Sequence, residues 1–182
     1  METRASEVNR MFNTSAVHYD WITRMMSFGS GKWYREQALK RAGIRAGMTV
    51  LDVGSGTGEV ALLEQKLVGD TGHVTALDPS EGMLAVAKQN GVKNTIIGKG
   101  ENLPFDDAHF DLLTMGYALR HVADLVQTFT EYRRVLKPGS KVLILEITRP
   151  QGKLAYWISK IHLKYLVPFI TRIFRRSADA QR

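Results

Sequence analysis

Short apolar runs recur through the middle of the chain, and each run is followed by a segment with helical spacing. The runs predict strands at Thr49–Val53, His73–Leu77, Thr95–Ile97, Phe110–Met115 and Lys141–Ile147. Helices are expected at Val60–Leu67, from Pro79-Ser80 to Asn90, and after a capping Asp124, the last with Leu125, Phe129, Tyr132 and Leu136 on one face. Strands that alternate with helices are typical of a parallel sheet in an α/β fold.

Turn residues mark the ends of these elements. Gly43 and Gly91 stand where glycine commonly ends a helix, and Lys137-Pro138-Gly139 predicts a turn before the last strand. Helical spacing also covers Met11–Met26 and Lys32–Arg41. We therefore expect one domain in three segments: a helical lid or substrate segment (1–47), an α/β core (48–150) and an amphipathic, basic helical tail (151–182).

The first predicted strand ends in a glycine-rich turn, Leu51-Asp52-Val53-Gly54-Ser55-Gly56-Thr57-Gly58-Glu59. Glycines at alternate positions let the backbone turn sharply and approach a ligand closely. The G-x-G-x-G spacing differs from the dinucleotide fingerprint G-x-G-x-x-G. With Asp52 just before it, the turn suits S-adenosylmethionine, whose amino-acid tail and cationic sulfonium can be held by backbone groups and a carboxylate.

A second strand end supports a nucleoside site. Asp78 closes the second predicted strand, where a carboxylate can accept hydrogen bonds from both hydroxyls of a ribose. In a parallel sheet, ligands bind at the carboxyl ends of the strands, where Gly54, Asp78, Gly100 and Gly116 are all expected.

Composition narrows the chemistry. The 182 residues contain no cysteine, which excludes disulfides and thiolate catalysis, and no His/Asp/Glu group has metal-ligand spacing, so no metal is predicted. The net charge of +7 favours an anionic partner surface, or simply solubility. The polar segment Met1–Arg10 lacks a signal-peptide core, so we expect a cytoplasmic protein. The apolar stretch Leu154–Phe174 is interrupted by charges and carries aromatic residues, which predicts peripheral membrane contact, or else a helix packed on the sheet or lining a substrate pocket.

Several further motifs join the glycine turn: Ala16-Val17-His18-Tyr19-Asp20, Met26-Ser27-Phe28-Gly29, Leu77-Asp78-Pro79-Ser80, Glu101-Asn102-Leu103-Pro104-Phe105, Tyr117-Ala118-Leu119-Arg120-His121-Val122 and Arg134-Val135-Leu136-Lys137-Pro138-Gly139. With these motifs the chain resembles the class I S-adenosylmethionine-dependent methyltransferases and, more narrowly, the ubiquinone/menaquinone biosynthesis C-methyltransferase family. The resemblance implies a Rossmann-like, doubly wound parallel sheet and methyl transfer to a ring carbon of a lipophilic quinone precursor or similar phenol.

The resemblance also implies site residues. The cofactor would be bound by Asp52, Gly54, Ser55, Gly56, Thr57, Gly58, Asp78, Pro79, Met83, Lys99, Gly100, Glu101 and Gly116. The acceptor ring would face Tyr19, Asp20, Arg120 and His121. We interpret His121 as the general base, with a hydrogen-bonding role in its loop as the alternative and His18 as the competing base.

The chain departs from the family pattern at several positions. Lys99 stands where Asp or Asn is usual, His121 where Asn is usual, and Gly116 where Ser is common. The family continues past the equivalent of Arg182 with an antiparallel strand pair, so we expect a sheet without that pair. The exposed edge of the fifth strand would then be covered by the tail or by a second copy in a homo-oligomer, unless the chain is a shortened one.

Two other functions remain open at this point. The same sheet could serve methylation of a different small molecule, because a fold does not fix its acceptor. The chain could also be an incomplete relative that binds the cofactor without catalysis. Nucleic acid is not expected as a partner, because the basic residues do not accompany a base-flipping motif.

Overall fold

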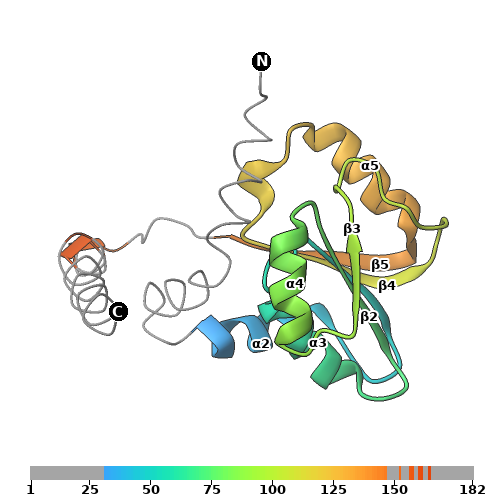
Figure 1. The fold of residues 1–182 in the computed structure, drawn as a ribbon, viewed down its shortest axis with the longest axis horizontal. Coiled ribbons are helices and arrows are strands. Elements are labelled where there is room, and N and C mark those ends of the chain that lie inside the picture. Colours follow the sequence, from blue (N-terminus) through green and yellow to red (C-terminus); the bar gives the residue numbers. More distant parts are fainter. Residues whose placement is uncertain (1–30, 147–151, 153–155, 158–159, 162–163, 165–182) are drawn as a thin grey trace, which may run out of the picture.

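The computed structural model describes residues 31–146, 152, 156–157, 160–161 and 164. They form a five-stranded sheet in the order β3-β2-β1-β4-β5 (Figure 1). The strands are β1 (Thr49–Val53), β2 (His73–Asp78), β3 (Asn94–Ile97), β4 (Phe110–Gly116) and β5 (Leu136–Leu145). The helices are α2 (Gly31–Ala42), α3 (Glu59–Val68), α4 (Glu81–Gln89) and α5 (Leu125–Val135), with the 3₁₀ helix η1 (Leu119–His121).

All neighbouring strands in this sheet are parallel. The predicted Rossmann-like, doubly wound parallel sheet is therefore confirmed, and β1 to β4 lie within one residue of their predicted bounds. No antiparallel strand pair occurs in the described part of the sheet. None of the described helices is long and apolar enough to cross a membrane.

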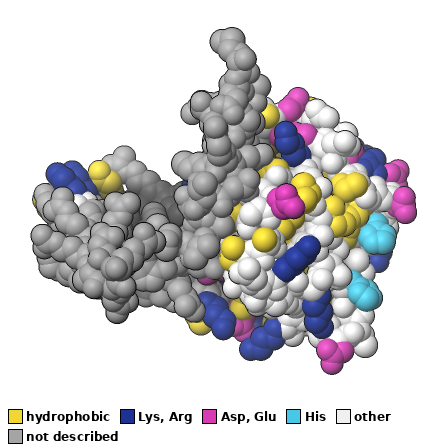
Figure 2. Space-filling model, viewed as in Figure 1, with side chains coloured by type: hydrophobic (Ala, Val, Ile, Leu, Met, Phe, Trp, Pro, Cys, Tyr) yellow, Lys and Arg dark blue, Asp and Glu magenta, His cyan; other side chains and the backbone are white. Residues whose placement is uncertain are grey.

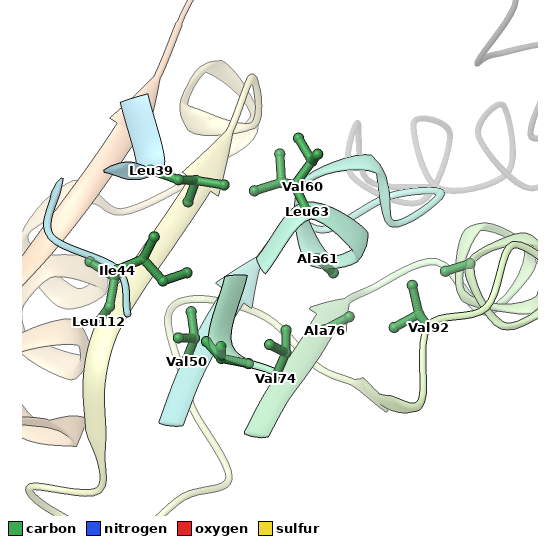
Figure 3. Close-up of a cluster of buried hydrophobic side chains, with 12 residues drawn as sticks. Leu39, Ile44, Val50, Val60, Ala61, Leu63, Val74, Ala76, Val92 and Leu112 are labelled. Atoms are coloured by element: carbon green, nitrogen blue, oxygen red, sulfur yellow. The ribbon is translucent and has the colours of Figure 1, made fainter. Parts of the chain in front are cut away.

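Alternating side chains divide each strand between two cores. Val50 of β1 and Leu112 of β4 face a cluster that receives Leu39 from α2 and several apolar residues of α3 (Figure 3). The side chains that alternate with these point to the other face of the sheet, where they form a second cluster with α5. Its strand residues include Leu51, Val53, Leu77, Leu113 and Met115, and α5 contributes Tyr132 and Val135. Because both faces are covered, the strands read as nearly continuous apolar runs in the sequence.

The predicted helix ends are confirmed. Ser80 Oγ accepts a hydrogen bond from the Met83 amide at 3.2 Å, and Asp124 Oδ1 accepts one from the Gln127 amide at 3.0 Å. Each bond satisfies one of the amides left unpaired in the first turn of a helix. After α4, Gly91 has the positive φ of +103° that glycine tolerates best.

The predicted face of α5 is confirmed at Tyr132 but wrong at Leu125 and Phe129. Leu125 and Phe129 are 50% and 40% exposed, whereas Thr128, Tyr132 and Val135 are buried against the sheet. The Tyr132 hydroxyl lies 3.9 Å from the sulfur of Met115 on β4. Leu136, the fourth predicted member, belongs to β5 and packs against the same cluster.

The start of the last strand also differs from its prediction. β5 begins at Leu136, which pairs with Phe110, so the Lys137-Pro138-Gly139 segment lies within the strand. This segment forms an irregularity in the pairing of β5 with β4. Phe110 pairs with Leu136, but Leu112, two residues later, pairs with Lys141, five residues after Leu136, and Gly139 between them has a φ of +81°. β5 is an edge strand of the described sheet, as β3 is at the other edge.

The predicted lid segment (1–47) and tail (151–182) lie mostly outside the described residues. Residues 1–30 and most of 151–182 lie outside the described residues, so the three-segment organisation stays a prediction. On the face of the molecule shown in Figure 2, acidic and basic side chains are interspersed over the described part of the surface.

Candidate active site

A cavity of about 740 Å³ lies at the carboxyl ends of β1, β2, β3 and β4. The strand order reverses at β1, which has β2 on one side and β4 on the other. Such a reversal opens a crevice above the sheet, because the connections on either side of it run in opposite directions. Most predicted site residues line the cavity: Gly54, Ser55, Gly56, Thr57, Asp78, Pro79, Met83, Lys99, Gly100, Glu101, Gly116, Arg120 and His121.

The glycine turn is fixed by its own backbone. The amides of Gly54 and Ser55 both donate to the carbonyl of Leu77, at 2.8 and 3.1 Å, so the turn is bonded to the neighbouring strand β2. Gly54 and Gly56 have φ values of +68° and +57°, in the left-handed region that other residues enter at a cost. Glycine therefore stabilises this turn at both positions relative to any other residue.

The three glycines serve different purposes. A Cβ on Gly54 would lie 2.6 Å from the Cβ of Ala118, and one on Gly58 would lie 2.4 Å from a methyl group of Val92. These two positions need glycine for close packing. A Cβ on Gly56 would meet nothing within 4 Å and would project into open space beside the cavity. Gly58 itself does not line the cavity, contrary to its predicted place at the cofactor.

Asp78 is buried at the end of β2, with only 8% of its surface exposed. Its Oδ2 accepts a hydrogen bond from the Gly56 amide at 2.9 Å, and its Oδ1 accepts one from the Ser80 amide at 2.8 Å. Burial raises the pKa of Asp78, and these two amides oppose the shift. Each oxygen keeps a lone pair for a ligand hydroxyl, because a carboxylate can accept about four hydrogen bonds.

Asp52 does not reach the cavity, and its prediction as a cofactor ligand is corrected here. Its side chain is fully buried on the α3 face of the sheet, where the Thr114 hydroxyl lies 3.0 Å from Asp52 Oδ1 and 2.7 Å from Glu64 Oε1. Burial raises the pKa of Asp52 to about 6 and raises that of Glu64 well above its usual value. One hydroxyl donates only one hydrogen bond, so one of the two carboxyls carries a proton.

The opposite wall of the cavity is the segment that follows β4. Tyr117 has a φ of +60°, and Arg120 Nη2 donates to its carbonyl at 2.8 Å. Arg120 also forms an ion pair with Glu146 at 3.3 Å. Burial and then the charge of Arg120 lower the pKa of His121, while Glu146 opposes them. A lowered pKa keeps the imidazole neutral at pH 7, where it can accept a proton.

A loop after β3 forms the third wall. Lys99 is exposed at the rim, and Gly100 is buried against Tyr132 and Val53. Glu101 Oε1 accepts a hydrogen bond from the Ala123 amide at 3.0 Å. This bond connects the β3 loop to the residues just after η1.

The profile of the ubiE/COQ5 methyltransferase family matches residues 1–182. The chain belongs to this family. It is 36% identical to the demethylmenaquinone methyltransferase of Staphylococcus aureus (strain MRSA252), over 95% of this chain and 73% of that protein. It is 33% identical to the ubiquinone/menaquinone biosynthesis C-methyltransferase of Shewanella halifaxensis, over 98% and 74% of the two chains.

Solved structures agree on the fold. An S-adenosyl-L-methionine-dependent methyltransferase structure, described as putative, from Methanococcus maripaludis superimposes with a TM-score of 0.67 at 23% identity, over 90% of this chain and 76% of that one. A SAM-dependent methyltransferase from Thermotoga maritima superimposes with a TM-score of 0.61 at 25% identity, over 74% of this chain and 59% of that one. This ubiE/COQ5 methyltransferase uses S-adenosylmethionine.

The residues of this methyltransferase fit that cofactor. The open space over Gly56 would be filled by any side chain, and the Asp78 carboxylate beside it suits ribose hydroxyls. Met83, at the start of α4, offers an apolar thioether surface for an adenine face. Lys99 cannot accept a hydrogen bond from the adenine amino group through its charged side chain.

Some residues of the methyltransferase cavity were missed in the sequence. Arg35, Glu59 and Tyr117 all line it. Tyr117 stood within a family motif, between Gly116 and Arg120, and could have been singled out there. Glu59 ended the glycine-rich motif and could have been singled out in the same way, whereas Arg35 carries no sequence signal, since a charged residue on a helix usually faces solvent.

The remaining predictions for the acceptor side fall on other parts of the chain. Tyr19, Asp20 and His18 lie outside the described residues. Within the described residues, no group of His, Asp and Glu side chains is arranged to hold a metal ion.

Proposed function

We propose that this methyltransferase transfers a methyl group to a ring carbon of a lipophilic phenol or hydroquinone, such as a quinone precursor. One observation carries the proposal: the glycine turn and the basic η1 helix open into the same cavity. The names of the Staphylococcus and Shewanella relatives point to menaquinone and ubiquinone precursors as acceptors.

The chemistry divides between the cofactor and the side chains of η1. S-adenosylmethionine supplies an electrophilic methyl group on sulfur when it is bound. Arg120 would hold the deprotonated oxygen of the acceptor, which makes the ring carbon a better nucleophile. The ring carbon would gain the methyl group as the methyl–sulfur bond breaks and the sulfur leaves as a neutral thioether. His121 would then take the proton that this carbon loses when the ring becomes aromatic again.

Positioning contributes more than proton transfer in this scheme. Holding two reactants in line can supply about 7–11 kcal/mol of the barrier, whereas a general base contributes roughly 10²–10⁴-fold in rate. The cavity volume of about 740 Å³ lies within the range of ligand sites, so a ring and the cofactor can lie together in it.

The membrane contact proposed for 151–182 is consistent with a lipophilic acceptor. Trp157 and Ile161 are 61% and 48% exposed, and the Lys160 ammonium lies 6.0 Å from the centre of the Trp157 ring. Aromatic and basic residues side by side are typical of helices at a membrane surface. The cytoplasmic location and a homo-oligomer stay predictions.

Replacing His121 with alanine tests the proposed function. With a short-chain hydroquinone acceptor, we expect turnover to fall roughly 10²–10⁴-fold while cofactor affinity is unchanged. In the wild-type enzyme, the rate should rise with pH as His121 loses its proton. Because its pKa is lowered, the rise should be centred at a lower pH than the titration of an ordinary histidine.

The matched control is His73→Ala, an exposed histidine at the amino-terminal end of β2, away from the cavity. This variant should keep the wild-type rate. Wild-type turnover in His121→Ala would remove the base from the scheme, and no methyl transfer to any phenolic acceptor by the wild-type enzyme would refute the proposed function.

A further inference from the structure

Two oppositely charged side chains from separate helices meet at the wall of the cavity next to the glycine turn. Arg35 comes from the second turn of α2, and Glu59 is the first residue of α3, directly after Gly58. Arg35 Nη2 lies 2.6 Å from Glu59 Oε2, and the two side chains are 11% and 27% exposed. Both line the cavity, so the ion pair is part of its surface.

Arg35 keeps donor capacity beyond this ion pair. Its guanidinium carbon lies 5.4 Å from the centre of the Tyr117 ring, within the range of a cation–π contact. Its Nε is buried and has no hydrogen-bond partner among the described residues. A buried donor without an acceptor is costly, and a carboxylate is the acceptor that a guanidinium binds best.

The other acidic groups near the cavity have different positions. Asp78 accepts the amides of Gly56 and Ser80 at the end of β2, and Glu101 accepts the amide of Ala123. Asp52, although close in sequence to the glycine turn, faces Thr114 on the other side of β1. Glu59 is the cavity-lining carboxylate that lies at the start of α3 and is paired with a cation of the cavity wall.

The other cations are placed differently. Lys99 follows β3, which is separated from β1 by β2. Arg120 is bonded to the Tyr117 carbonyl and to Glu146 on the far wall. Arg35 is the cavity-lining cation that is joined to the start of α3, where the backbone amides of a helix also favour an anion.

We propose that the Arg35–Glu59 pair binds the zwitterionic amino-acid end of the cofactor, with Arg35 on its carboxylate and Glu59 on its ammonium group. A pair of opposite charges matches a ligand end that carries the same two charges, and neither side chain is left uncompensated when the site is empty. The inference depends on the cofactor and holds for any methyl acceptor.

Calorimetry with two ligands tests this assignment. S-adenosylhomocysteine carries the amino-acid end, whereas 5′-methylthioadenosine has the same nucleoside and sulfur without it. In Arg35→Gln, the affinity for S-adenosylhomocysteine should fall roughly ten- to a hundredfold, the worth of a charged hydrogen bond, while the affinity for 5′-methylthioadenosine stays within about twofold. A structural role alone would weaken both ligands equally.

Further variants keep the test decisive. Glu59→Gln should repeat the selective loss, and Arg35→Lys, which keeps the charge but not the forked donors, should lie between wild type and Arg35→Gln. Lys40→Gln, which breaks the exposed Lys40–Glu36 pair on the same helix, should leave both affinities unchanged. If Arg35→Gln does not fold, Arg35→Lys carries the comparison.

Equal losses for the two ligands, or no loss for either, would overturn the assignment. The outcome is independent of the proposed function. A wild-type enzyme that binds S-adenosylhomocysteine selectively but methylates no phenol would refute the acceptor and leave the Arg35–Glu59 assignment standing.

Discussion

The two halves of the cavity are held in different ways. In the glycine-turn half, made of Gly54–Thr57 and Asp78, backbone amides and a buried carboxylate fix one another through short hydrogen bonds. In the η1 half, made of Tyr117–His121, long and exposed side chains rest on a short 3₁₀ turn. A backbone cradle suits a ligand that never changes, whereas exposed side chains can be exchanged to suit another acceptor.

The two halves should therefore respond differently to substitution, in cofactor affinity and in turnover. Changes in the glycine-turn half should alter cofactor affinity, and changes in the η1 half should alter turnover at unchanged cofactor affinity. Six substitutions, grouped from the largest expected effect on binding or turnover to the smallest, test whether the two halves are separable.

Asp78→Ala should weaken cofactor binding roughly 100-fold or more, because it removes a charged acceptor and leaves the Gly56 amide without a partner. Calorimetry measures the loss. In the wild-type protein the raised pKa of Asp78 means that cofactor affinity should fall on acidification at a higher pH than for an ordinary aspartate. Unchanged affinity in Asp78→Ala would contradict the ribose assignment.

Gly56→Ala should lower cofactor affinity about tenfold and cost about 1–2 kcal/mol of stability, because its methyl group enters the cavity and φ is positive. Gly58→Ala should instead cost about 2–5 kcal/mol of stability without a direct effect on the cofactor, since its methyl group would lie 2.4 Å from a methyl group of Val92 and its φ is positive. Thermal unfolding and calorimetry separate the two outcomes. Equal damage by both substitutions would show that the open space over Gly56 is not a ligand site.

Arg120→Ala should lower turnover about tenfold and raise the KM for the acceptor, because the acceptor oxygen loses its cation. Cofactor affinity should stay within about twofold, since Arg120 is bonded to Tyr117 and Glu146 on the η1 side. Steady-state kinetics and calorimetry on the same preparation check both statements. A large loss of cofactor affinity would break the separation of the two halves.

Lys99→Ala should change cofactor affinity by less than about threefold, because the exposed ammonium group cannot accept a hydrogen bond from an adenine amino group. Lys99→Asn, which restores an acceptor, should bind at least as tightly as the wild type. Weaker binding in Lys99→Asn would indicate that the lysine contributes a contact of its own.

The same contrast explains what the sequence revealed. The glycine turn and Asp78 were predictable because only certain residue types satisfy a left-handed backbone and a ribose. The β1 bounds, Thr49–Val53, followed from an apolar run that ends at that turn. The pairing of Arg35 with Glu59 was not predictable, because it depends on how α2 packs against α3 and not on either local sequence.

Two errors have a similar origin. Asp52 was assigned to the cofactor from its place beside the glycines, but strand alternation turns its side chain toward Thr114 and Glu64. The face of α5 was chosen from apolar residues alone, so it included the exposed Leu125 and Phe129 and left out the buried Thr128. In both cases a polar side chain is buried with a hydrogen-bond partner: Asp52 with the Thr114 hydroxyl, and Thr128 with the carbonyl of Asp124.

The adjacency of β1 and β4 has a consequence for synthesis of the chain. Leu51 and Leu113 are neighbours in the sheet, yet more than sixty positions separate them along the polypeptide. When β1, β2 and β3 have left the ribosome, the glycine turn has been made, but β1 can pair only with β2. The other edge of β1 stays unpaired until β4, Phe110–Gly116, has been synthesised. Pairing between strands so far apart in the sequence slows folding. A chain that ends prematurely between β3 and β4 should therefore be an incompletely folded fragment that chaperones bind and proteases degrade.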